Sequence, residues 1–162
     1  MQREVFHFKT VAIPYDVARR FMRDDPGGLF SPAVDGSTTE KDTVVGLLEV
    51  DLDGIIMGAD VTLEIGAFEE IVEPLPLSKR TLGWHASEHA GIFPILTGEL
   101  EAFPAGDHST QITFTCHYRP PLKAVGAVVD TVYLHRIADD CLERFFDRVI
   151  DTLEHAAERL SD

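Results

Sequence analysis

Basic residues are scarce in this sequence of 162 residues, where 14 Lys and Arg stand against 28 Asp and Glu and the formal net charge is −14. No Lys- or Arg-rich run interrupts that excess. A nucleic-acid backbone or an anionic membrane surface would therefore be repelled, and no nucleic-acid partner is expected. Solubility is the simplest role of the acidity, and recognition of a protein partner is the alternative.

Long hydrophobic runs are also missing, since no apolar stretch approaches the ~20 residues that a membrane span needs. The first residues lead into a strand-like pattern and not into a signal-peptide core. We therefore expect a cytoplasmic protein without membrane insertion. The sequence has only two cysteines, Cys116 and Cys141, and both stand on apolar faces. They are expected to be small buried thiols without a disulfide.

Motifs that carry catalysis are lacking as well. There is no nucleophile elbow and no phosphate-binding glycine loop, and the segment 26–28 (Pro-Gly-Gly) has no lysine after it and is interpreted as a helix breaker. His85 and His89, with Glu88 between them, have a spacing that could hold a metal on a helix. They follow a strand and enter a loop, so that geometry and a third ligand are both missing. No metal and no cofactor are expected.

Proline is absent, and glycine does not recur, between Gly126 and Leu160, which predicts a long C-terminal helix over that range. Its apolar residues recur at helical spacing on one side, opposite an acidic side, so one face is expected to be buried. The apolar stripe consists of Ile137, Cys141, Phe145, Val149 and Leu153, widened by Leu142, Phe146 and Ile150.

The first two thirds of the chain alternate as strands do. A strand over 5–11 is followed by a helix that Pro14 starts, and by a second short turn of helix over 29–34. Asp53-Gly54 predicts a tight hairpin inside a block of strands. In the last strand, four apolar residues alternate with polar ones, which is typical of an antiparallel sheet with one covered face; they are Ile112, Phe114, Cys116 and Tyr118. We predict one α+β domain over residues 1–162, with a sheet and a long helix as its two layers.

This layout resembles the START-like (SRPBCC) superfamily, also called helix-grip or Bet v 1-like, which includes polyketide cyclases. The residues that carry the likeness lie in the second half: 82–86 (Leu-Gly-Trp-His-Ala), Phe93-Pro94, 98–100 (Gly-Glu-Leu), 118–121 (Tyr-Arg-Pro-Pro), Asp130 and 134–138 (Leu-His-Arg-Ile-Ala). The resemblance implies a curved antiparallel sheet that wraps around the C-terminal helix, with two short helices after the first strand. It also implies a mostly apolar cavity between sheet and helix.

From that cavity, the expected function is binding of a small hydrophobic or aromatic molecule. A cyclase- or aromatase-type enzyme and a regulator that binds a protein partner are the two alternatives. The sequence identifies no catalytic residue and assigns no oligomeric state. His7 and His117 lie beside wet-face neighbours, and solvent exposure is expected for both.

The candidate ligand-binding residues are chosen by strand parity and helix spacing. Trp84, Phe114 and Leu100 fall on the covered faces of strands, although a purely structural role suits Trp84 equally well. Val129 and Tyr133 are four residues apart and share a helix side near the expected mouth. Asp130 beside them either orients a ligand or simply complements the helix start. Near loops, Phe30 and Phe93 either gate an entrance or cap the core; these eight residues are the predicted site.

Overall fold

The computed structural model describes residues 3–52, 54–86, 95–119 and 131–161. Within these ranges there are seven strands, three α-helices and one 3₁₀ turn, and the helices come after the first strand and at the end, as the sequence pattern suggests. Their bounds are β1 Arg3–Val11, α1 Tyr15–Asp24, α2 Pro26–Phe30, η1 Ser31–Ala33, β2 Asp35–Glu40, β3 Thr43–Leu52, β4 Ile55–Ile71, β5 Leu77–Ala86, β6 Ile95–Gly106, β7 Ser109–Arg119 and α3 Thr131–Ser161.

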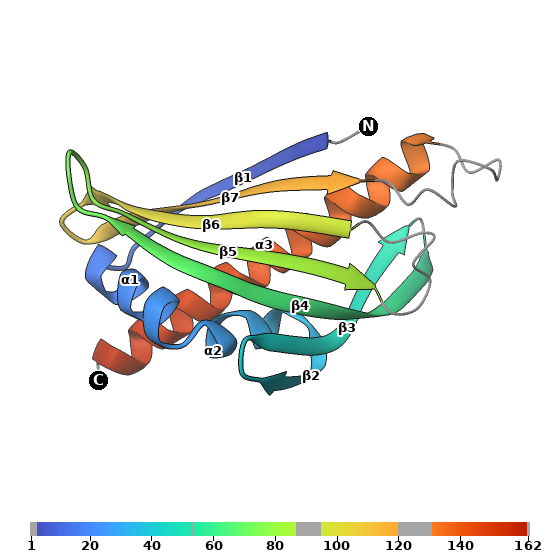
Figure 1. Cartoon of the computed structure of the whole chain (residues 1–162), viewed down its shortest axis with the longest axis horizontal. Helices are drawn as coiled ribbons and strands as arrows, with labels where there is room; N and C mark the ends of the chain where they lie inside the picture. Colours follow the sequence, from blue (N-terminus) through green and yellow to red (C-terminus); the bar gives the residue numbers. More distant parts are fainter. Residues whose placement is uncertain (1–2, 53, 87–94, 120–130, 162) are drawn as a thin grey trace.

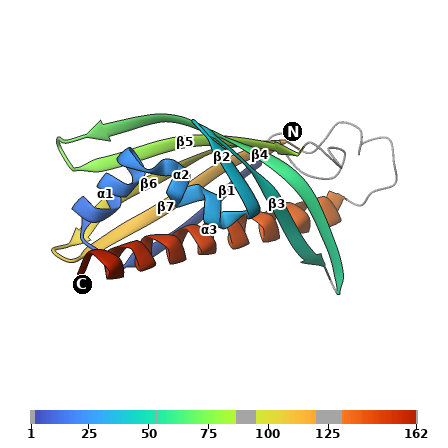
Figure 2. The same cartoon turned by 90° about the horizontal axis from the view of Figure 1, so that it is seen from below.

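The strands form one antiparallel sheet in the order β1-β7-β6-β5-β4-β3-β2. The sheet curves, and α3 runs diagonally across its concave side while α1 and α2 lie beside the same helix (Figures 1 and 2). The predicted hairpin at residues 53–54 is confirmed, because Leu52 of β3 pairs with Ile55 of β4. Gly54 has a φ of 88°, a conformation that suits a residue without a side chain.

The covered face of the sheet follows the predicted alternation. Ile112, Phe114, Cys116 and Tyr118 of β7 are at most 2% exposed. The opposite side of the strand carries Thr115 and His117, which are half-buried. Strand parity therefore identified correctly which residues of β7 meet the helix.

The C-terminal helix begins at Thr131 in the described part of the chain, whereas the sequence predicted Gly126. Residues 126–130 lie outside the described ranges. The predicted stripe is confirmed from Cys141 onward, because Cys141, Phe145, Val149 and Leu153 are each at most 1% exposed. The side chain of Ile137, the first residue of the predicted stripe, lies outside the described part of the structure. Burial of this stripe against the sheet is what holds the two layers together, because apolar area removed from water is the main stabilising term.

The break that the sequence predicted at this point is confirmed, because α1 ends at Asp24, but the segment 26–28 is itself helical. It forms the first turn of α2, which spans 26–30, followed by η1 instead of one turn over 29–34. The Asp25 carboxylate accepts a hydrogen bond of 2.9 Å from the Gly28 amide, and Pro26 occupies the first helical position. Asp25-Pro26 is thus a helix-start signal here. The aspartate side chain accepts a hydrogen bond from an amide in the first turn, and proline has no amide hydrogen that would need an acceptor.

Strand β2 was not predicted. Its six residues are all exposed, so no apolar alternation marks it. It forms the edge of the sheet beyond β3, and the pairing has an irregularity between Asp35 and Thr38. Pairing with β3, and not hydrophobic pattern, makes this segment a strand.

Arg80 of β5 fixes α1 against the sheet. Its guanidinium donates hydrogen bonds to the carbonyl oxygens of Met22 (3.2 Å) and Arg23 (3.1 Å) at the end of α1, and to that of Gly66 in β4 (2.9 Å). It also lies 5.3 Å from the centre of the Phe68 ring. A cation at a helix C-terminus satisfies carbonyls that have no partner within the helix.

Candidate functional site

An aromatic cluster occupies the space between the concave face of the sheet and α3. Its centre is Phe145 of α3, whose ring lies 5.2 Å from Trp84, 5.6 Å from Phe114 and 6.1 Å from Phe30, measured between ring centres. All four side chains are at most 3% exposed. Three predicted site residues therefore surround Phe145: Trp84 from β5, Phe114 from β7 and Phe30 from α2.

Leu100 joins this cluster from β6, where it pairs with Phe114 and is 1% exposed. The other predicted site residues cannot be placed. Phe93, Val129 and Asp130 lie outside the described residues, and so does the side chain of Tyr133, although its backbone belongs to α3. Ligand contact by the eight residues therefore remains a prediction.

Gly98 is a position at which the aromatic cluster leaves no room for a side chain. A Cβ atom built there would lie 2.9 Å from a ring carbon of Phe114 and 3.3 Å from the sulfur of Cys116. The Phe114 ring thus lies over the backbone of the neighbouring strand. Sequence reasoning used Gly98 only as a landmark, and this close approach gives the physical reason for a glycine.

The expectation that His7 is exposed was wrong. Its ring stacks on Phe146 of α3 at 5.9 Å, and its Nε2 atom is buried without a hydrogen-bond partner among the described residues. The Phe146 ring in turn stacks on Phe114 at 6.2 Å. The available signal in the sequence was that the apolar residues Val5 and Val11 have the same parity as His7, since residues of equal parity share a face of a strand. His7 is therefore an ionisable group at the border of the aromatic cluster.

Both cysteines are buried and free, as predicted. Burial raises the pKa of the Cys141 thiol to about 12, with a further contribution from the Asp140 carboxylate. Burial alone raises the pKa of Cys116 well above its usual range. Neither thiol is a nucleophile at neutral pH, because the thiolate is the reactive form.

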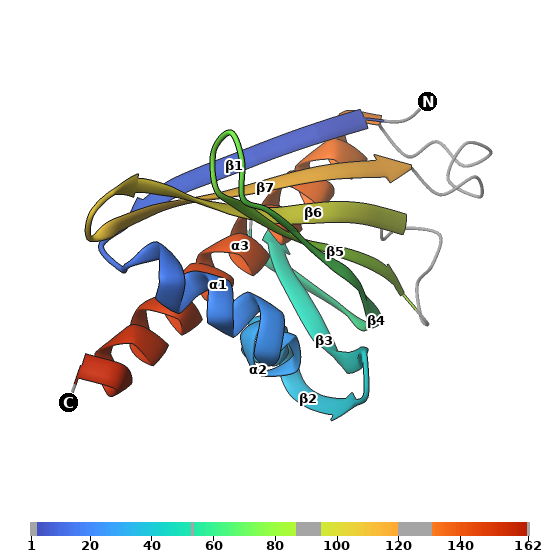
Figure 3. The ribbon, with the colours of Figure 1, turned by 60° about the vertical axis from the view of Figure 1, so that its left-hand side comes forward.

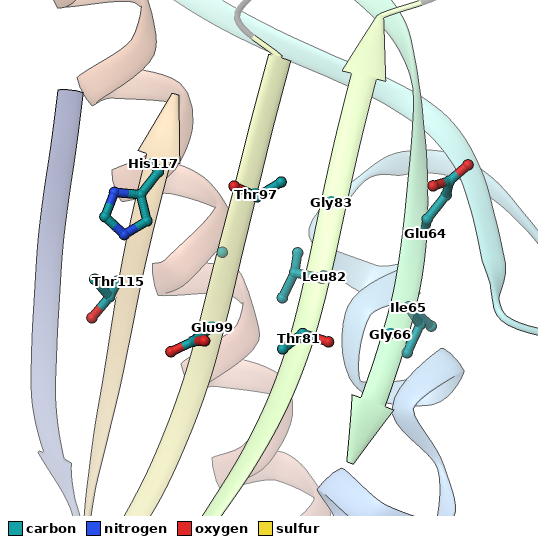
Figure 4. Close-up of a pocket in the computed structure, with 11 residues that line it drawn as sticks. Glu64, Ile65, Gly66, Thr81, Leu82, Gly83, Thr97, Glu99, Thr115 and His117 are labelled. Carbon is teal, nitrogen blue, oxygen red and sulfur yellow. The ribbon is translucent and has the colours of Figure 1, made fainter. Parts of the chain in front are cut away.

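A second candidate site is a groove of about 510 Å³ on the other side of the sheet (Figure 4). In this close-up α3 passes behind the strands, so the groove and the aromatic cluster lie on opposite faces. Threonines, glycines, ionisable groups and two apolar side chains line it: Thr81, Thr97, Thr115, Gly66, Gly83, Gly98, Glu64, Glu99, His117, Ile65 and Leu82.

The charges around this groove are mostly paired at the surface. Lys79 lies 3.6 Å from Glu99 and 3.5 Å from Glu69, and these carboxylates raise its pKa, with Glu99 the largest cause. His117 lies 3.8 Å from Glu4 and its side chain is 44% exposed, as the sequence predicted. The groove is open to solvent and offers hydroxyl, carboxylate and imidazole groups as hydrogen-bond partners for a polar molecule.

Within the ranges that the structure describes, no three His, Cys, Asp or Glu side chains come together in a way that could hold a metal ion. His85 is exposed at the end of β5, and Glu88 and His89 lie outside those ranges. Among the same residues, no helix is long and apolar enough to cross a membrane.

No family model matches the sequence, and no curated protein matches it. Solved structures do match the fold. The Zhui aromatase/cyclase from Streptomyces sp. R1128 is 20% identical with a TM-score of 0.61, and the match covers 100% of this chain and 97% of that one. A START superfamily protein from Mycobacterium smegmatis is 14% identical with a TM-score of 0.59, covering 94% and 97%. Norcoclaurine synthase from Thalictrum flavum is 12% identical with a TM-score of 0.53, covering 93% and 86%.

These likenesses define the class of the protein by its fold. A curved seven-stranded antiparallel sheet that grips a long C-terminal helix, with short helices after the first strand, is the helix-grip fold. The fold that the sequence resemblance implied is therefore confirmed. At such low identities the likeness carries the fold and not the activity.

Proposed function

We propose that the protein binds a small hydrophobic or aromatic molecule between the concave face of the sheet and the first half of α3. The observation that carries this proposal is the apolar lining around the aromatic cluster. It continues from Trp84 along paired residues of neighbouring strands, with Leu63 on one side and Leu96 and Tyr118 on the other. All four are buried.

Trp84 and Tyr118 stand near the carboxyl ends of β5 and β7, and these strand ends lie toward the start of α3 (Figure 1). Ala86, one step further along β5, faces the same side and offers only a methyl group. Flat apolar molecules are the ligands that such walls recognise, because aromatic side chains provide large contact areas with defined ring geometry. The outer groove is less suited to this ligand class, since hydroxyl and carboxylate groups line it.

A titration with 1-aminoanthracene, a neutral flat probe, tests the proposal. The chain has a single tryptophan, so quenching of Trp84 emission reports on the interior. Two phenylalanine substitutions form a matched pair: Ala86→Phe fills the proposed site, and Thr97→Phe fills the outer groove. We expect Ala86→Phe to weaken binding at least about tenfold, which corresponds to about 1.4 kcal/mol, and Thr97→Phe to leave it unchanged. The reverse order, with both variants folded by circular dichroism, would reject the interior site.

A cyclase- or aromatase-type enzyme is the second candidate function. Two observations favour it: the Nε2 atom of His7, which is buried without a hydrogen-bond partner among the described residues, and the structural likeness to a protein described as an aromatase/cyclase. In this proposal His7 or Tyr133 transfers a proton on a poly-ketone bound in the interior. Replacement of either group, as His7→Gln or Tyr133→Phe, should then lower turnover by roughly 10²–10⁴. For a binding protein, Tyr133→Phe changes affinity by only about 1 kcal/mol, the worth of one hydrogen bond.

A further inference from the structure

We infer that two copies of the chain associate edge to edge through β1, so that their two sheets form one continuous antiparallel sheet. This surface lies away from the interior under α3, and the association does not depend on ligand binding. Two observations carry it: a strand edge that has no partner strand among the described residues, and a pair of exposed phenyl rings on that strand.

Strand β1 ends the sheet, and β7 is its hydrogen-bonded neighbour in the described part of the chain. Figure 3 shows β1 along the open side of the molecule. It pairs with β7 without a register shift over its whole length, from Arg3 to Val11, and contains no proline. Monomeric proteins usually protect such an edge with a bulge, a proline or a very short strand, because its free amides and carbonyls can pair with another strand.

Phe6 and Phe8 stand on the outer face of β1 and are 54% and 64% exposed. Their rings lie 5.8 Å apart. Their neighbours on β7 are Thr115 and Thr113, which are uncharged, and Glu4, the next residue on this face of β1, lies 3.8 Å from His117. An uncharged aromatic patch on a chain with a net charge of −14 is a feature of an interaction surface more than of a solvated one.

A second copy is the partner because β1 is complementary to itself. The two phenylalanines stand at equal distances on either side of His7. A two-fold axis through His7 places Phe6 opposite the partner's Phe8, and Phe8 opposite the partner's Phe6. Residues directly opposite each other in an antiparallel pair point to the same face, so four rings gather around the axis.

Other registers that keep the two faces aligned are worse. A shift to an axis through Phe6 places Phe8 opposite the partner's Glu4. A shift to an axis through Phe8 places Phe6 opposite the partner's Thr10. Each shift breaks up the ring cluster, whereas the axis through His7 places Glu4 opposite the partner's Thr10 and Lys9 opposite the partner's Val5. No like charges face each other in that register.

The expected contact is small. A phenyl side chain can bury roughly 200 Å², so the exposed fractions of four rings amount to about 470 Å². The strand edges add to this, but the total stays near or below the lower end of about 1,200 Å² for stable interfaces. We therefore expect a reversible dimer at micromolar or higher concentrations. Added salt should strengthen it, because salt screens the repulsion between two acidic chains.

Analytical ultracentrifugation from low micromolar to near-millimolar protein tests the association. We expect the average mass to rise from 18.0 kDa toward twice that value. The double variant Phe6→Thr/Phe8→Thr should weaken association at least about tenfold while keeping residues that favour strands. Ile56→Thr is the matched control, because Ile56 is 68% exposed on β4, and it should have no effect. A protein that stays monomeric throughout, or a double variant that still dimerises, would overturn the inference.

Disulfide trapping tests the register with the same protein. Opposite residues in an antiparallel pair have Cα atoms about 4.5–5.5 Å apart, within the range that a disulfide spans. His7→Cys should therefore give a reducible dimer under mild oxidation, because the axis pairs position 7 with itself. Thr10→Cys should not, since it lies opposite the partner's Glu4, and the native thiols are buried. Disulfide trapping through position 10 but not through position 7 would contradict this register and the dimer. A chain that stays monomeric and binds lipid vesicles through Phe6 and Phe8 would contradict the dimer as well.

Discussion

Replacement of Phe145 by alanine tests the grip of the sheet on the helix. Phe145 is 1% exposed and lies within 5.2–6.1 Å of three other rings. A buried Phe→Ala change costs roughly 3–5 kcal/mol, and each aromatic pair adds about 0.5–1.5 kcal/mol beyond its buried area. We therefore expect a loss at the upper end, about 4–5 kcal/mol of the free energy of unfolding.

For a chain of this length, each kcal/mol lowers the melting temperature by about 2–4 °C, so Phe145→Ala should melt roughly 8–20 °C below the native protein. Urea unfolding, followed by circular dichroism and Trp84 emission, gives the free energy directly. Leu75→Ala serves as the control, since Leu75 is 76% exposed in a loop and its loss should stay within about 0.5 kcal/mol. A loss of less than about 1.5 kcal/mol for Phe145→Ala would refute the packing described here.

Three further outcomes are expected. Burial raises the pKa of Cys141 to about 12 and that of Cys116 well above its usual range, whereas an ordinary thiol ionises near 9.0. The contribution of the two neutral thiols to the free energy of unfolding should therefore be complete below pH 9 and fall as the pH rises toward 12. Urea melts across that pH range measure this loss. Arg80→Met should lower the free energy of unfolding by about 2–3 kcal/mol and speed amide exchange at the end of α1, because three hydrogen bonds to carbonyl oxygens are lost. Lys79→Met removes only exposed ion pairs, so it should lower the free energy of unfolding by less than about 1 kcal/mol. Finally, the protein should not bind DNA or RNA at moderate salt, and submicromolar binding that weakens steeply with added salt would disprove this.

The sequence predicted the fold where periodicity is strong. The stripe around Cys141 and Phe145 has helical spacing, and the alternation around Phe114 has strand spacing, so both buried faces were correct. Strand β2 was missed because all its residues are exposed, so that its pairing with β3 leaves no apolar alternation in the sequence. The start of α2 was missed because Asp25-Pro26 was interpreted as a break and not as a cap.

The site was harder to predict, because parity gives the face of a residue and not its partner across the core. Trp84 and Phe114 were assigned to the covered face, but nothing in the pattern showed that both contact Phe145. It was similarly hard to predict which face of β1 is buried. Aromatic residues usually mark the buried face, yet Phe6 is exposed and His7 packs on the helix, since the outer face of an edge strand can serve a second contact.

Isotope-filtered nuclear Overhauser spectroscopy of the labelled protein with unlabelled 1-aminoanthracene tests the central claim most directly, since it reports which side chains lie against the bound probe. The account predicts contacts from the probe to the Trp84 indole and to the methyl groups of Leu63 and Leu96, which line the concave face. Contacts to the methyl groups of Thr97 and Thr115 in the outer groove, without any to Trp84, would contradict an interior ligand site.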